Sequence, residues 1–182
     1  MPTKPSMSLK EYQDRALKTA EPRAFQRDYL IPGIVGEIGE LFGQKAKGYW
    51  HGWTPEQLQK ELVSEYGDIC WMTATLLYTR GVDQLSPQYP DVPGALRWGT
   101  VTPEMALLNG GTQLYQVATL QDEALTASAM WLEEAAEKMW RLLRAHSSVV
   151  TGVPFQDVLE ANLQKLADRA ARGVLRGSGD HR

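Results

Sequence analysis

The stretch that decides the fold is GEIGELFGQKAKGYWHGWTPEQLQKELVSEYGDICW, residues 36–71. It holds two acidic pairs, Glu37 with Glu40 and Glu65 with Asp68, separated by twenty-four residues. This spacing places both members of a pair on one helix face, and two antiparallel helices joined by a short turn bring the pairs together. Carboxylates about 4 Å apart repel by roughly 4 kcal/mol at an effective dielectric constant of about 20. Because Mg²⁺ and Mn²⁺ prefer oxygen ligands, we expect a magnesium site that faces a phosphate-bearing substrate.

Capping residues predict the second of these two helices. Thr54 and Gln57 form a T-x-x-Q capping box around Pro55, which suits the first helical position. We therefore expect a connecting turn at residues 48–55, GYWHGWTP, and a helix over residues 55–79.

The helix before this turn contains a proline and repeated glycines. We expect it to begin at Ala24 or Gly33 and to end near Lys47, with Pro32 either kinking it or lying in its first turn. Each glycine in a helix costs about 1 kcal/mol relative to alanine. The glycines therefore indicate the close approach of another helix or of a ligand, the alternative being a frayed helix; they are Gly33, Gly36, Gly39 and Gly43.

Helical patterns account for most of the remaining chain. A capping box at Ser8 and Glu11 predicts a first helix over residues 9–20. Three prolines and two glycines predict an irregular connection at residues 83–102. Beyond it we expect a helix from residue 103 that Gly110 and Gly111 break or bend, then one long helix or a hairpin over 112–146, a turn at 147–154, a helix over 155–172, and an extended tail.

Length and composition predict one soluble domain spanning residues 1–182. Because no strand-like alternation occurs in the sequence, we expect this domain to be all-α. With 43% apolar residues and a net charge of −3, the chain has no general attraction to nucleic acid or anionic membranes. Cys70 is the only cysteine, which indicates a reducing compartment and a small buried side chain. No apolar stretch suits a membrane span or a signal peptide, so we expect a cytoplasmic protein without membrane or polymeric nucleic-acid partners.

The ordered motifs resemble those of the MazG-like superfamily of all-α nucleoside triphosphate pyrophosphohydrolases, in its phage and bacterial branch. The resemblance rests on E-x-x-E followed by E-x-x-D, on the segment LVSEYGDICWMTATL, and on His51-Gly52 in the turn. The opening EYQDRALKTA and the segment DVLEANLQKLADR extend it, so that it covers roughly residues 9–82 and 155–182. It implies a helical bundle in which residues 84–150 form an additional helical insertion, assembled as a homodimer or homotetramer.

The resemblance also implies a reaction and its residues. Glu37, Glu40, Glu65 and Asp68 would hold Mg²⁺, with Mn²⁺ as a substitute, and an activated water would cleave a (d)NTP to a (d)NMP and pyrophosphate. The substrate-binding candidates are cations near the motifs, the N-x-x-K pair, and aromatic or histidine side chains that suit a base pocket. They are Lys45, Lys47, Trp50, His51, Trp71, Asn162, Lys165 and Arg169.

Two departures from the family pattern keep alternatives open. Many members carry an acid where this chain has Gly36, which leaves Glu61 as the nearest candidate for orienting the water. Residues 84–150 are longer than the usual connection and form either an inserted hairpin or a substitute for contacts with a second subunit. The alternative function is a non-catalytic helical module that binds a nucleotide or a partner. A di-iron carboxylate protein is disfavoured because the chain has no E-x-x-H pair.

Overall fold

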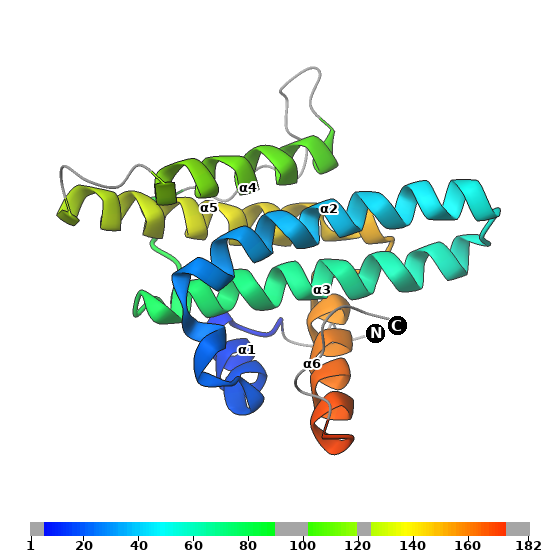
Figure 1. The fold of residues 1–182 in the computed structure, drawn as a ribbon, viewed down its shortest axis with the longest axis horizontal. Coiled ribbons are helices and arrows are strands. Elements are labelled where there is room, and N and C mark those ends of the chain that lie inside the picture. The colour runs from blue at the N-terminus through cyan, green and yellow to red at the C-terminus, as the bar shows by residue number, and fades with distance from the viewer. Residues whose placement is uncertain (1–5, 90–101, 120–124, 174–182) are drawn as a thin grey trace.

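The computed structural model describes residues 6–89, 102–119 and 125–173, and these ranges contain helices and no strand (Figure 1). The predicted all-α class is therefore confirmed. In chain order the elements are α1 (Leu9–Ala16), two 3-10 turns η1 (Leu17–Thr19) and η2 (Pro22–Phe25), α2 (Arg27–His51), α3 (Pro55–Thr79), α4 (Pro103–Thr119), α5 (Leu125–Thr151) and α6 (Phe155–Ala171). Most of the predicted irregular connection and the tail lie outside the described residues.

Helices α2 and α3 form a long antiparallel hairpin in the middle of the molecule (Figure 1). The predicted capping box starts α3, because the Thr54 hydroxyl accepts from the Gln57 amide and the Gln57 side chain accepts from the Thr54 amide. Helix α2 ends at His51 rather than near Lys47, so the first half of the predicted turn is helical. The reason is Gly52, whose φ of 63° closes the helix in the left-handed conformation.

The proline and the glycines of α2 occupy different environments. Pro32 lies inside the helix, which begins at Arg27, and its missing N–H leaves one carbonyl of the preceding turn without a helical bond. A Cβ on Gly33 would lie 2.5 Å from the Met72 sulfur, so the predicted close approach of a helix is confirmed there. No described helix approaches the other three glycines, which have no atom within 4 Å of such a Cβ, so for them the approach of a ligand stays a prediction: Gly36, Gly39 and Gly43.

Helices α4 and α5 form a second hairpin that packs against α2 and α3 (Figure 1). The open question for residues 112–146 is thus decided in favour of a hairpin. Gly110 and Gly111 do not break α4, which is continuous. Gly111 instead allows close packing, since a Cβ there would lie 2.6 Å from Ile38 Cδ1. The predicted turn at 147–154 is also too long, because α5 continues to Thr151 and turns at Gly152, where φ is 78°.

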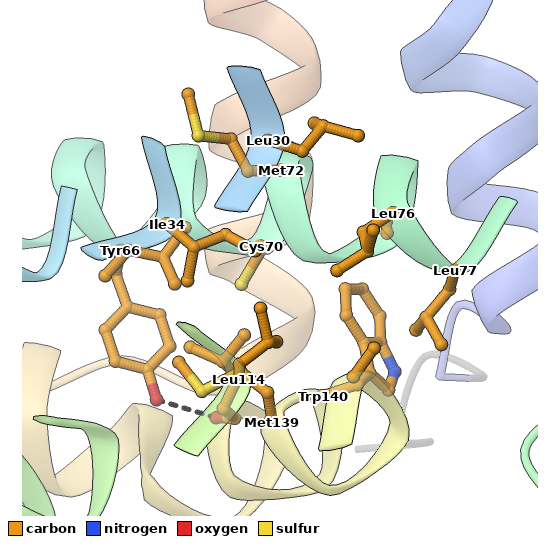
Figure 2. Packing of buried hydrophobic residues seen from close by; sticks show 14 of the residues in the cluster. Leu30, Ile34, Tyr66, Cys70, Met72, Leu76, Leu77, Leu114, Met139 and Trp140 are labelled. Atoms are coloured by element: carbon orange, nitrogen blue, oxygen red, sulfur yellow. Dashed lines mark hydrogen bonds between the residues drawn. The ribbon is translucent and has the colours of Figure 1, made fainter. Parts of the chain in front are cut away.

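The core lies between the two hairpins and contains side chains from all four of their helices (Figure 2). Tyr66 is fully buried, and its hydroxyl donates to the Leu143 carbonyl at 2.8 Å. Cys70 is buried as predicted, and burial raises the pKa of its thiol well above the usual value. The side chains labelled in Figure 2 are Leu30, Ile34, Tyr66, Cys70, Met72, Leu76, Leu77, Leu114, Met139 and Trp140.

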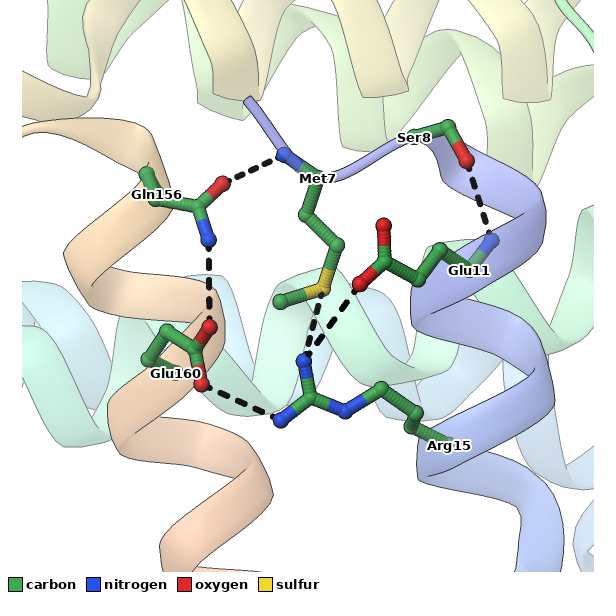
Figure 3. Close-up of polar contacts among 6 residues, drawn as sticks. All are labelled: Met7, Ser8, Glu11, Arg15, Gln156 and Glu160. Atoms are coloured by element: carbon green, nitrogen blue, oxygen red, sulfur yellow. Dashed lines mark hydrogen bonds and ion pairs between the residues drawn. The ribbon is translucent and has the colours of Figure 1, made fainter. Parts of the chain in front are cut away.

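Helices α1 and α6, from opposite ends of the chain, lie side by side (Figure 3). The backbone amide of Met7 donates to Gln156 Oε1 at 2.6 Å, and Arg15 forms an ion pair with Glu160 at 3.1 Å. Both helices also contact α3, so the first and last helices together cover part of the central hairpin. None of the described helices combines the length and the apolar character that crossing a membrane requires.

Buried His146 in α5 predicts a loss of stability at acid pH. Neither of its ring nitrogens has a hydrogen-bond partner, and burial lowers its pKa below 6.5, against the opposing effect of Glu104. A histidine with a lowered folded-state pKa binds protons more readily when unfolded, so stability falls as the pH drops below about 6.5. Urea unfolding of wild type and His146→Gln between pH 7.5 and 5 should show a smaller loss in the variant. An equal loss in both proteins would contradict this assignment, and His51→Gln is the control for removal of an imidazole.

Candidate functional site

The register of α2 against α3 places three of the four predicted acids at one point. Oxygen atoms of Glu37, Glu65 and Asp68 lie within 4.8 Å of one another. Glu40 is exposed one turn further along α2 and is outside this group, although its negative charge contributes to the raised pKa values of Glu37 and Glu65. The two acidic pairs therefore meet as predicted, but with three carboxylates in contact and the fourth beside them.

Burial makes this acidic cluster unfavourable when all its members are charged. Burial raises the pKa of Glu37 to about 8, and the neighbouring charges of Asp68, Glu40 and Glu65 add to the effect. Burial also raises the pKa of Glu65, against the opposing hydrogen bond from Gln44. A buried carboxylate stays charged at low cost only with a positive or hydrogen-bonding partner. A cation placed among these carboxylates would lower this cost.

One carboxylate oxygen of Glu65 accepts a hydrogen bond, and the other has no hydrogen-bond partner. Its side chain is 2% exposed, and Oε1 accepts from Gln44 Nε2 at 2.6 Å. The other oxygen, Oε2, is buried and has no hydrogen-bond partner. An acceptor left in this way costs about 1–3 kcal/mol. Glu65, a member of the acidic cluster, therefore has one carboxylate oxygen without a partner.

Helix α6 brings the predicted N-x-x-K pair to Asp68. Asn162 Nδ2 donates to Asp68 Oδ1 at 3.0 Å, and Lys165 Nζ lies 2.6 Å from Asp68 Oδ2. Lys165 also donates to the Ser64 hydroxyl at 2.7 Å. Both oxygens of Asp68 are thus held by residues almost one hundred positions further along the chain.

Two contributors to the site were missed by sequence reasoning. Tyr12 is fully buried in α1, and its hydroxyl donates to Asn162 Oδ1 at 2.7 Å, which orients the amide so that its nitrogen faces Asp68. Tyr12 was not among the candidate site residues, and its position in the sequence contains no sign of the Asn162 contact. Gln44 lies on α2 seven residues after Glu37, hence on the same helix face, and that spacing was the available signal.

Glycine at position 67 allows α6 to reach the carboxylates. A Cβ on Gly67 would lie 2.9 Å from the Cβ of Asn162 and 3.0 Å from its Nδ2. Since the Asn162 Cβ is attached to the α6 backbone, any larger residue at 67 has to push that helix away. Close packing of α6 against α3 therefore explains why a glycine lies between Glu65 and Asp68.

Several predicted substrate-binding residues lie away from the carboxylates. Lys45 forms an ion pair with Glu104 of α4 and is thereby directed to the other hairpin. Lys47, Trp50 and His51 are exposed at the end of the α2–α3 hairpin, and the His51 ring stacks on Trp53 with centroids 6.3 Å apart. This structure does not bring the aromatic turn to the acidic cluster.

The remaining candidates lie closer to it. Glu61 is one turn before Glu65 on α3 but outside the three-carboxylate group. Trp71 follows Asp68 by three residues and packs against the core, with its indole N–H buried and without a partner. Burial raises the pKa of Tyr29 of α2, the charges of Glu37 and Asp68 add to this, and the charge of Arg169 opposes it, so Arg169 and Tyr29 lie within electrostatic range of each other and of the acids. Tyr29 is a further neighbour of the site that sequence reasoning did not name.

No protein-family model, curated protein or solved structure matches the chain. The likeness to the MazG-like superfamily accordingly stays a prediction from the motifs. What the site does has to follow from the chemistry of its side chains.

Replacing Gly67 with alanine should separate helix packing from helix propensity. We expect Gly67→Ala to destabilise the protein by about 1–3 kcal/mol through overpacking against Asn162. Gly36→Ala is the matched control, because open space surrounds its Cβ and alanine favours a helix by up to about 1 kcal/mol. Urea unfolding followed by circular dichroism measures both. Equal effects of the two substitutions would show that α6 does not depend on Gly67.

Proposed function

We propose that this protein is a magnesium-dependent nucleoside triphosphate pyrophosphohydrolase that converts a (d)NTP into a (d)NMP and pyrophosphate. The observation that carries the proposal is the meeting of Glu37, Glu65 and Asp68 within 4.8 Å beside Lys165, a cation from another helix. Carboxylates and a lysine at one point can face a metal and the phosphates that the metal binds.

The donor set suits Mg²⁺ or Mn²⁺. All three side chains offer oxygen atoms, which these hard cations prefer, and no histidine or cysteine belongs to the described group. The unpartnered Oε2 of Glu65 is a ligand atom whose burial cost a cation would remove. Glu37, Glu65 and Asp68 would therefore hold the metal, with Glu40 one turn away. When bound, the ion would neutralise phosphate charge and make a coordinated water more acidic.

The protein's own residues supply orientation and charge. Gln44 holds one oxygen of Glu65 and so fixes the carboxylate. Tyr12 and Asn162 form a buried chain of hydrogen bonds that fixes Asp68 from the other side. In the proposed reaction the oxygen of a water bonds to the α-phosphorus, the bond to the bridging oxygen of the β-phosphate breaks, and a carboxylate accepts the water proton. Pyrophosphate leaves with the bridging oxygen.

The alternative, a non-catalytic module, is supported by the position of Glu61. No acid occupies position 36, and Glu61, expected to orient the water in its place, lies outside the three-carboxylate group. A site that binds a metal nucleotide without a positioned base would give affinity and little turnover. The predicted homodimer or homotetramer and the cytoplasmic location remain predictions.

Pyrophosphate release distinguishes these two functions. Wild type, incubated with a panel of NTPs and dNTPs, should release pyrophosphate with Mg²⁺ and none with EDTA. Glu65→Gln and Asp68→Asn, which keep the side-chain shape, should lose activity by about 100-fold or more, since even residues that only support metal ligands are worth about 10–100-fold. Asp83→Asn, at an exposed position, is the matched control.

Metal binding provides a second readout that needs no turnover. Mg²⁺ should raise the melting temperature of wild type and of Asp83→Asn, but not that of Glu65→Gln, because a ligand stabilises the state it binds. If nucleotides bind with Mg²⁺ and none is cleaved, the non-catalytic module is the correct function. If Mg²⁺ stabilises Glu65→Gln as much as wild type, the metal site is elsewhere.

A further inference from the structure

A groove between α3 and α6 opens directly beside the acidic cluster. Its volume is about 650 Å³, within the range of about 300–1,000 Å³ typical of small-molecule sites. Ser64, Asn162 and Lys165 line the groove, and the last two also contact Asp68. A ligand in the groove would therefore continue into the candidate metal site.

The groove carries a small excess of positive charge on a protein that is negative as a whole. Three cationic side chains line it, Lys60, Lys165 and Arg172, against two acidic ones, while the chain has a net charge of −3. Such a local concentration attracts anions whatever the sign of the net charge. The groove is thus a place for the negatively charged part of a ligand.

Two of these cations are available to a ligand. Lys165 is engaged with Asp68 and Ser64. Lys60 forms no ion pair with any residue in the described ranges, and neither does Arg172, whose Nε donates to the Asp168 carbonyl at 3.2 Å. A guanidinium keeps further N–H donors in a fork that matches phosphate oxygens. Lys60 and Arg172 both lie on exposed positions, so their charges can meet a ligand without a change of fold.

The two sides of the acidic cluster differ in chemistry. Lys60 and Ser64 precede Asp68 on α3, and the groove lies on their side. Trp71 follows Asp68, and Tyr29, which precedes Glu37 on antiparallel α2, lies on the same side as Trp71. No aromatic residue is among the described residues that line the groove. Phosphates suit the groove side, and a stacked base suits the side of Tyr29.

We propose that the α3–α6 groove binds the pyrophosphate part of the nucleotide, with Lys60 and Arg172 as its phosphate ligands. This inference rests on the proposed function, because it names the leaving group of that reaction. Pyrophosphate carries most of the charge of a triphosphate, so two cations beside the metal site offset charge where the leaving group departs. The α-phosphate lies at the carboxylates, and the nucleoside points away from the groove.

Binding of the two products tests which end of the nucleotide lies in the groove. Magnesium pyrophosphate and a panel of nucleoside monophosphates are titrated calorimetrically into full-length wild type and into Lys60→Ala/Arg172→Ala. We expect the double variant to bind pyrophosphate at least tenfold more weakly and the monophosphates within twofold of wild type. Lys18→Ala/Arg80→Ala removes the same charge from exposed positions outside the groove and should bind both products as wild type does.

Three results would overturn the inference. Weaker monophosphate binding with unchanged pyrophosphate binding would show that the groove holds the nucleoside. Unchanged binding of both products would show that the groove is not used. Equal losses of affinity in the two double variants would show that the effect comes from net charge and not from the groove. These titrations need no turnover, so a failure of the groove leaves hydrolysis by wild type intact, whereas the proposed function fails when no nucleotide releases pyrophosphate.

Discussion

The packing of α2 against α3 forces carboxylates of like charge together inside a folded hairpin. Glu37, Glu65 and Asp68 meet because the capped turn at Thr54 and the close contact of Gly33 with Met72 allow one register. Repulsion among buried acids opposes that register, and the raised pKa of Glu37 reflects its burial first and this repulsion second. The apolar side chains between the two hairpins have to stabilise the fold by more than this repulsion costs.

Helices α1 and α6 offset part of the repulsion among the carboxylates. Helix α6 contributes Lys165 and Asn162 to Asp68, and α1 contributes Tyr12, which orients the Asn162 amide. Contacts between α1 and α6 hold this group against α3, and Gly67 lets it approach (Figure 3). The acidic hairpin and the two terminal helices are thus one connected structural unit. The α4–α5 hairpin packs on the α2–α3 hairpin and shares its core.

Sequence reasoning succeeded where a signal is local and failed where contacts are distant. The capping box at Thr54 and the Ser8 cap of α1 involve neighbours in the chain, and the structure contains both, the latter as the bond from the Glu11 amide to the Ser8 hydroxyl. Lys45 could not be placed, because its partner Glu104 is 59 residues away and a lysine on a helix surface carries no sign of its direction. For the same reason the packing role of Gly111 looked like a helix break.

Lys165 illustrates why the number of cations near the site matters. Its single ammonium group lies 2.6 Å from Asp68 and 2.7 Å from the Ser64 hydroxyl, so it is already committed to holding the carboxylate cluster together. If it turned to a phosphate, Asp68 would lose the charge that compensates it. A triphosphate brings several negative charges at once, and one shared lysine cannot offset both these charges and Asp68. For the proposed triphosphate, cations besides Lys165 and the metal would offset this charge, and Lys60 and Arg172 line the adjoining groove.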